Sequence, residues 1–141
     1  MKNRSLLLAI IILFFSMSSF AQNHVVGERF GGGIIFYVDS SGQHGLIADS
    51  TDQKDANWLD AINECKELRD GDYTDWRLPS LDEIELLYTQ KTLFGSLSYG
   101  SFHWTSSEKD ADHAYALAFV GDMRLSYRKS LSISVRAVRN F

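Results

Sequence analysis

The run "SSEKDADHAY" contains three carboxylates at alternate positions, Glu108, Asp110 and Asp112. Alternating oxygen atoms in a loop between strands can bind a hard cation such as calcium. The run lacks the glycine and the distal glutamate of an EF-hand loop, which favours a solvated acidic loop. We therefore expect no metal site, and these three residues remain the calcium alternative.

Two arginines further along the chain offer chemistry for binding anions. The pair Gly121-Asp122 predicts a tight two-residue hairpin between strands at 113–120 and 123–127. Small alanines then share the inner face with two larger residues: Ala114, Ala116, Ala118, Leu125 and Tyr127. The outer face carries the alternate residues, namely Tyr115, Leu117, Phe119, Arg124, Ser126 and Arg128. Arg124 and Arg128 can form charge-assisted bonds to sulfate or carboxylate groups, so with Tyr115 they are the candidate ligand-binding residues.

No residue is assigned a catalytic role. Cys65 is the only cysteine, so no intramolecular disulfide can form, and its position on a predicted helix indicates a buried structural thiol. The chain has no G-x-S-x-G nucleophile motif. Its four histidines show no metal-binding spacing; they are His24, His44, His103 and His113. We expect a protein that is not an enzyme and has no cofactor.

The segment "NWLDAINECKELRDGDY" predicts an amphipathic helix. Its apolar residues recur at spacings of three and four: Trp58, Ala61, Ile62, Cys65 and Leu68. Asn57 or Asp55 can cap the start of this helix. Gly71 suits the left-handed residue just past its end.

The segment "TDWRLPSLDEIELLYTQ" predicts a short extended piece followed by a second helix. Trp76 and Leu78 alternate with Arg77, and Pro79 favours an extended residue before it. Ser80 and Glu83 then form the Ser-x-x-Glu capping box. The buried stripe of the helix is expected at Leu81, Ile84, Leu87 and Tyr88. Every residue of the motif therefore has a structural role.

The remaining patterns predict strands. Strands at 34–38 and 45–48 flank a turn at 39–42, and the glycine run 31–33 serves backbone geometry rather than phosphate binding. The segment 91–100 is a loop, and 102–107 is a strand. The final strand, 130–138, buries Leu131, Ile133, Val135 and Ala137 and exposes the alternate residues, including Arg136. This order predicts an α+β domain with two helices packed beside a twisted antiparallel sheet.

The first residues have the layout of a cleavable signal peptide. Lys2 and Arg4 precede an apolar run at 6–15, and small residues close on Ala21. The run is too short to span a bilayer. We expect residues 1–21 to be removed, leaving one domain at 22–141 with no transmembrane anchor. The protein is then exported, and is secreted, periplasmic or bound to the cell surface.

The charge of the chain excludes one class of partner. The formal net charge is −4, and removing Lys2 and Arg4 makes it −6. A general nucleic-acid binder needs a basic footprint, so nucleic acid is not an expected partner. The same charge gives no long-range attraction to an anionic membrane.

The order of these motifs resembles the Lcl C-terminal domain family, named for part of a collagen-like bacterial adhesin. The resemblance rests on Trp58 and Cys65, then on "DWRLPS" with Glu83, then on "WTSSE" from Trp104, and finally on "VRAVR" at 135–139. It implies a C-type-lectin-like fold, in which two helices flank antiparallel sheets. Formylglycine-generating enzymes share "RLP…E", but they depend on a late cysteine pair that is missing here.

The resemblance also implies a function. Many members are secreted or surface-exposed modules, and the adhesin is associated with sulfated glycosaminoglycans. The expected function is a non-enzymatic binding module that recognises a glycan or a surface protein through loops and a strand face. The alternative is a structural or assembly domain of the cell envelope without a small-molecule ligand.

Overall fold

The computed structural model describes residues 22–95, 101–121 and 123–141. The predicted signal peptide at 1–21 and the second half of the predicted 91–100 loop lie outside the described residues. Two 3-10 turns, Asp70–Asp72 and Lys91–Leu93, follow the helices. The other elements of the described ranges are, in chain order, β1 (Arg29–Phe30), β2 (Gly33–Val38), β3 (Gly45–Ala48), β4 (Gln53–Ala56), α1 (Trp58–Glu67), α2 (Leu81–Thr89), β5 (Phe102–Glu108), β6 (His113–Ala118), β7 (Met123–Arg128), β8 (Ile133–Val135) and β9 (Val138–Asn140).

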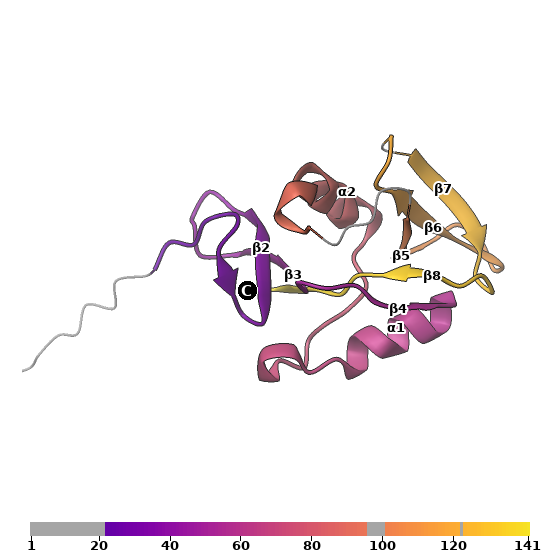
Figure 1. Ribbon diagram of the computed structural model, residues 1–141, viewed down its shortest axis with the longest axis horizontal. Coiled ribbons are helices and arrows are strands. Elements are labelled where there is room, and N and C mark those ends of the chain that lie inside the picture. Colours follow the sequence, from indigo (N-terminus) through magenta and orange to yellow (C-terminus); the bar gives the residue numbers. More distant parts are fainter. Residues whose placement is uncertain (1–21, 96–100, 122) are drawn as a thin grey trace, which may run out of the picture.

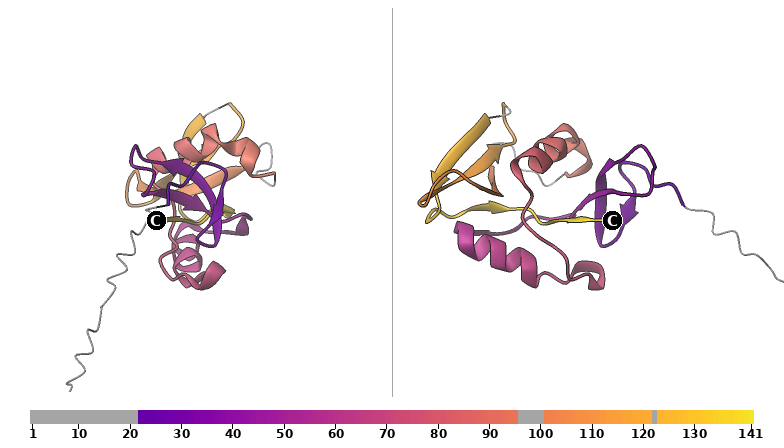
Figure 2. Two further views of the ribbon diagram at one scale, coloured as in Figure 1. Left: turned by 90° about the vertical axis from the view of Figure 1, so that its left-hand side faces the viewer. Right: turned by 180° about the vertical axis from the view of Figure 1, so that it is seen from behind.

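The strands form two sheets, and the helices lie on opposite sides of the segments that join them (Figures 1 and 2). The smaller sheet has the order β1-β2-β3-β9 and the larger sheet the order β4-β8-β5-β6-β7. Helix α1 packs on β4 and β5, whereas α2 packs on β2, β5 and β6. The predicted α+β class is confirmed, with two helices flanking antiparallel sheets. One pairing was not predicted, because β5 and β8 run parallel through His103 and Ser134.

Helix α1 begins where the sequence predicts. The Asn57 side chain accepts a hydrogen bond of 3.0 Å from the Asp60 amide, which makes it the N-cap. The alternative cap, Asp55, accepts a bond of 2.8 Å from the Ser134 hydroxyl instead. Three residues of the predicted stripe are buried: Trp58, Ala61 and Cys65.

The predicted end of α1 is wrong. The helix ends at Glu67, and its C-cap, Leu68, has an extended backbone. Gly71 does adopt a left-handed φ of 64°, but in the 3-10 turn that follows. A Cβ on Gly71 would lie 2.7 Å from the Cα of Gly32, so the position requires glycine for a contact between two loops. Such a long-range contact has no local sequence signal.

Helix α2 begins with the predicted capping box. The Ser80 hydroxyl accepts from the Glu83 amide at 3.2 Å, and a Glu83 oxygen accepts from the Ser80 amide at 2.8 Å. Arg77 donates two further bonds of 2.7 Å to the same carboxylate. Burial alone would raise the pKa of Glu83, but the bonds from Arg77 and Ser80 lower it overall. The motif therefore fixes the start of a helix.

The last segment of the chain departs from the prediction of one half-buried strand. It forms two short strands in different sheets, β8 and β9. Ile133, Val135 and Ala137 are buried as predicted, but Leu131 is 45% exposed and Arg136 is fully buried. Arg136 turns inward because its guanidinium binds the Asp52 carboxylate, with Nε and Oδ1 2.7 Å apart.

The residues of the family resemblance meet in the core. One buried cluster contains Trp58, Cys65, Trp76, Leu78 and Trp104. The indole donors are satisfied inside it, since Trp58 donates to the Thr105 carbonyl at 2.7 Å and Trp104 to the Ala56 carbonyl at 2.9 Å. The second cluster packs α2 against β2 and β6.

The first hairpin and its glycine run follow the prediction. Strands β2 and β3 enclose the expected turn at 39–42. Gly31 and Gly32 have positive φ values of 59° and 87°, and a Cβ on Gly33 would lie 2.2 Å from the Ala48 carbonyl oxygen. The run therefore allows close backbone packing, as predicted from the glycine pattern.

An arginine-bearing face and pocket on the β6–β7 hairpin

The three candidate ligand-binding residues come from one face of the β6–β7 hairpin. Tyr115 lies opposite Ser126, with Arg124 and Arg128 two positions away on either side along β7. Side chains alternate between the two faces of a strand, so all four side chains lie on the same face. The face predicted for Tyr115, Arg124 and Arg128 is therefore confirmed by the strand register.

The connection between these strands is longer than predicted. Strand β6 ends at Ala118, directly opposite Met123 at the start of β7. The connection thus has four residues rather than the two expected from Gly121-Asp122, and every pairing shifts by two positions. A shift of two residues leaves each side chain on its predicted face, whereas a shift of one would reverse the faces.

Half of the predicted outer face is covered by α2. Leu117 and Phe119 are 0% and 2% exposed and pack with Ile84 of α2, so their predicted outward position is wrong. Arg124 lies at this covered end and forms an ion pair with Glu85 of α2, with Nη2 and Oε2 2.6 Å apart. The alternation of residues in β6 did not predict that α2 covers this face, because the contact between α2 and β6 joins distant parts of the chain.

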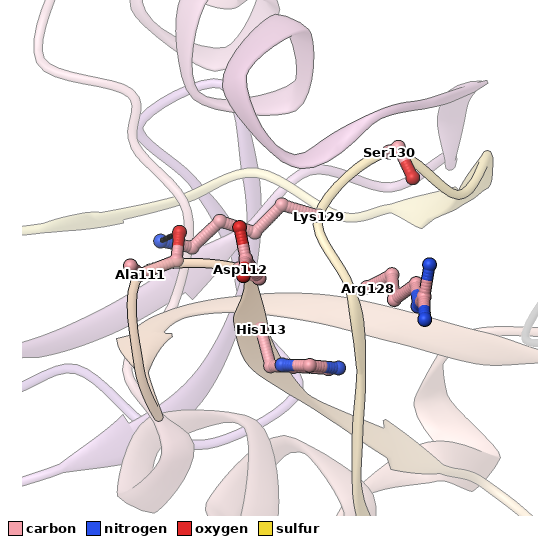
Figure 3. Close-up of a pocket in the computed structure, with 6 residues that line it drawn as sticks. All are labelled: Ala111, Asp112, His113, Arg128, Lys129 and Ser130. Carbon is pink, nitrogen blue, oxygen red and sulfur yellow. Dashed lines mark hydrogen bonds between the residues drawn. The ribbon is translucent and has the colours of Figure 1, made fainter.

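The other end of the face opens into a pocket of about 440 Å³ (Figure 3). The Arg128 and His113 side chains extend to the same side of the hairpin, while the Lys129 side chain runs the opposite way. The pocket is lined by six residues from the 111–113 and 128–130 segments: Ala111, Asp112, His113, Arg128, Lys129 and Ser130.

The cations of this pocket differ in what they already bind. Lys129 donates to Glu108 at 2.7 Å and to the Ala111 carbonyl at 2.9 Å, and its ammonium lies 4.6 Å from the Trp58 ring centroid. Arg128 is exposed, and its side chain has no ion pair or hydrogen bond with the part of the chain that the structure describes. Arg128 is thus the available charge of the pocket.

His113 is held in place by a turn. Its ring Nδ1 lies 2.9 Å from Asp110 Oδ1, which also accepts bonds from the Asp112 and His113 amides. The bond with His113 is the main reason that the pKa of Asp110 is lowered. Because Nδ1 faces Asp110, the other ring nitrogen, Nε2, is the one available to a ligand.

The three residues of the calcium alternative have different structural contacts. Glu108 binds Lys129, and Asp110 organises the turn before β6. The backbone carbonyl of Asp112 accepts a bond from the Lys129 amide. Within 22–95, 101–121 and 123–141, no group of three acidic, histidine or cysteine side chains is placed to hold a metal ion.

Cys65 lies in a structural environment. Its side chain is fully buried and unpaired with another cysteine. Burial raises the pKa of the thiol to about 12, and Glu64 and Asp49 contribute to the increase. A thiol with such a pKa is protonated at neutral pH and is a poor nucleophile, in agreement with the structural role expected from the sequence.

Sequence reasoning missed a buried ionic cluster. Asp52 Oδ1 accepts bonds from His103 Nε2 at 3.0 Å and Arg136 Nε at 2.7 Å, and Arg136 also donates to the Asp49 carbonyl at 2.6 Å. Burial alone would raise the pKa of Asp52, but His103 and Arg136 lower it overall. No local pattern could have found the cluster, because its members come from three distant segments.

No helix in the described ranges has the length and apolar character needed to cross a membrane. A family model described as the Lcl C-terminal domain matches residues 21–139. No curated protein gives a significant match to the sequence. Among solved structures, the chain is similar to the crystal structure of botrocetin, with 13% sequence identity and a TM-score of 0.49. That similarity covers 81% of this chain and 93% of the botrocetin chain.

Proposed function

Because the chain belongs to the Lcl C-terminal domain family, we propose that it is an exported, non-enzymatic module that binds a sulfated or carboxylated glycan. The binding site is the Arg128 pocket together with the open half of the β6–β7 face. One observation carries the proposal: Arg128 is an exposed cation in a pocket, without a partner among the described residues.

The pocket groups fit an anionic substituent of a sugar. The planar guanidinium of Arg128 can donate two parallel bonds to a sulfate or carboxylate. His113 and Ser130 line the same pocket and can supply further hydrogen bonds. A hydrogen bond to a charged group contributes about 1.5–3 kcal/mol net, so Arg128 alone accounts for a large part of a weak binding site.

The rest of the face allows contact with a longer ligand. Tyr115 is partly exposed between the pocket and Arg124, and its ring can pack against the apolar side of a sugar. Arg124 and Arg128 are four residues apart, which corresponds to about 13 Å along an extended strand. A glycan with anionic groups at this spacing would contact both arginines, and Arg124 would exchange Glu85 for the ligand.

The test compares a sulfated polymer with its neutral parent. Dextran sulfate should bind the protein without residues 1–21, whereas unmodified dextran should not. Arg128→Gln should weaken the binding of dextran sulfate at least about tenfold, because the substitution removes a charge-assisted interaction. Binding is measured by biolayer interferometry at two salt concentrations, since ionic contacts weaken with salt.

A matched control is Lys54→Gln. Lys54 is exposed on β4, the opposite edge of the larger sheet, and four strand spacings of about 4.8 Å separate β4 from β7. This substitution removes the same charge and should leave binding within about twofold of the original. Equal losses in Lys54→Gln and Arg128→Gln, or equal binding of neutral dextran, would contradict the proposed site.

A further inference from the structure

Strand β7 has a free edge. It is the last strand of the larger sheet and pairs only with β6 within the described ranges. Figure 1 shows β7 at the outer end of the larger sheet, on the far side from the smaller sheet and α1. Helix α2 contacts β7 through the Arg124–Glu85 ion pair. A strand in this position presents unpaired backbone groups to solvent and is a template for another extended segment.

The register identifies the backbone groups that face outward. The Lys129 amide donates to the Asp112 carbonyl at 2.8 Å, so this pair is hydrogen-bonded across the hairpin. In an antiparallel ladder, hydrogen-bonded pairs alternate with pairs whose backbone groups point away from each other. The alternation places the amides of Arg124, Ser126 and Arg128 at the open edge.

The two faces of β7 differ in the chemical character of their side chains. Met123 and Leu125 are 49% and 38% exposed and lie on one face with the partly buried Tyr127. Arg124 and Arg128 lie on the other face, on either side of Ser126. The exposed edge is therefore apolar on one side. The other side carries Arg128, which is available, and Arg124, which is paired with Glu85.

We propose that the free edge of β7 pairs with an extended segment of another protein in which acidic and apolar side chains alternate. Its backbone bonds to the outward amides of β7, as in other cases of strand addition. Its acidic side chains lie beside Arg128 and beside Arg124, which exchanges Glu85 for the partner. Its apolar side chains lie beside Met123 and Leu125. Opposite charges across neighbouring strands stabilise the pairing, whereas like charges destabilise it.

A second copy of this chain fits the edge poorly. Two symmetric antiparallel arrangements overlap β7 equally, with either Leu125 or Ser126 on the twofold axis, and both bring the arginines of the two copies onto one face. The less favourable of them has Ser126 on the axis. Arg124 of one copy is then directly opposite Arg128 of the other, and this unfavourable pair occurs twice. The charge pattern consequently favours a partner that carries carboxylates.

The edge is a different site from the glycan pocket, although both use Arg128. A glycan lacks the amide and carbonyl ladder of a strand, so it does not need the outward amides of β7. A peptide strand needs both these amides and the arginines. A change confined to one outward amide therefore separates the two activities.

The probe is a fluorescein-labelled peptide, Glu-Val-Glu-Val-Glu-Val-Glu, with blocked termini, and the readout is fluorescence anisotropy. We expect this peptide to bind at least about tenfold more tightly than the matching Lys-Val peptide. Slower exchange is expected for the amides of Arg124, Ser126 and Arg128 when the acidic peptide is added, as observed by NMR. Absence of binding, or protection only at other amides, would overturn the proposal.

The variant that separates the sites is Ser126→Pro. Proline has no amide hydrogen and is tolerated where the amide faces away from the sheet. Ser126→Pro should abolish peptide binding, whereas Ser126→Ala should keep it. Because both variants remove the same hydroxyl, their affinities for dextran sulfate should agree within about twofold. Peptide binding that survives in a folded Ser126→Pro protein would refute strand addition. A doubled mass without peptide in sedimentation would instead identify a second copy as the partner.

Discussion

At the scale of single residues, Glu83 combines a helix cap with an ion pair. Its carboxylate accepts bonds from both Arg77 and the Ser80 amide, and its pKa is lowered in the folded protein. A carboxylate with a lowered pKa stabilises the fold above its unfolded-state pKa of about 4.3. That contribution disappears as the pH falls through the folded-state pKa, because the protonated group no longer attracts Arg77.

The corresponding prediction concerns Glu83→Gln. The substitution should lower the free energy of unfolding at pH 7 by about 1 kcal/mol, because glutamine keeps part of the cap but loses the charge. The difference from the original protein should shrink between pH 5 and pH 3, as followed by urea unfolding with tryptophan fluorescence. Glu67→Gln, at the exposed end of α1, is the control and should have a smaller effect. A difference that is independent of pH would show that the ion pair contributes nothing.

Asp110 and Arg128, two charged residues near the pocket, differ in how many partners their side chains have. Asp110 is exposed and shares its oxygen among three donors, yet its role is to shape one turn. Arg128, four residues from Arg124 in the sequence, has the opposite character, because no described residue satisfies it. The proposed recognition of an anionic ligand therefore rests on Arg128 rather than on the acidic run.

At the scale of elements, the close pairing of β2 and β3 depends on glycine. A Cβ on Gly45 would lie 2.1 Å from the Tyr37 carbonyl oxygen and 2.7 Å from the Phe141 ring. The nearest obstacle is backbone in a paired strand, so it cannot move without breaking the ladder. This position admits no side chain, although its backbone does not require a positive φ.

We predict that Gly45→Ala destabilises the protein by about 1–3 kcal/mol, the usual cost of inserting atoms into a packed site. The change is measured as a lower urea midpoint with an unchanged slope. Gly95→Ala is the matched control, since a Cβ there meets no atom within 4 Å. Equal midpoints for the two variants would contradict the proposed steric role of Gly45.

The elements that the sequence predicts well are those with local signals. The capping box at Ser80 and the stripe from Trp58 to Cys65 depend on residues within one or two turns, so α2 and the start of α1 are predicted correctly. The predicted exposure of Arg136 is wrong. The alternation of apolar and polar residues shows which residues share a face of a strand, but it does not show that Asp52 binds Arg136 inside the protein. The predicted faces of the hairpin are correct although the predicted turn length is wrong, because a register shift of two residues leaves each side chain on the same face.

The proposed binding site is less predictable from the sequence, because its geometry also depends on long-range contacts. Arg124 and Arg128 are correctly assigned to one face, but the sequence does not show that Glu85 of α2 binds one of them. Nor does it show that His113 and Ser130 meet Arg128 in a pocket, since that depends on the path of two turns. Long-range packing decides which of two equivalent cations is available.

At the scale of the whole molecule, the two sheets are joined by a pair of neighbouring connections. One runs from β3 to β4 and contains Asp49 and Asp52, and the other runs from β8 to β9 and contains Arg136. The Asp49 amide donates to the Ala137 carbonyl at 3.0 Å, and Arg136 binds both aspartates. The buried ionic cluster therefore ties together the two crossings between the sheets.

This connection predicts that the sheets unfold together and that Asp52 strongly affects their stability. Asp52→Asn leaves the buried Arg136 guanidinium without its carboxylate and should lower the free energy of unfolding by about 2–3 kcal/mol. That value is below the 3–5 kcal/mol typical of a fully buried pair, because the Asp52 side chain is 22% exposed. Tryptophan fluorescence and circular dichroism should give coincident urea transitions in both proteins.

Asp55→Asn is the control for Asp52→Asn, since Asp55 is exposed and accepts a bond from the Ser134 hydroxyl. Its effect should stay below about 1 kcal/mol, the typical net contribution of a single hydrogen bond. Equal decreases in the free energy of unfolding in the two variants would show that the buried cluster contributes no more than an exposed hydrogen bond. A shared ionic cluster and a shared tryptophan core require the two sheets to unfold in one step. Separate transitions in the original protein would therefore contradict this prediction and show that each sheet is stable alone.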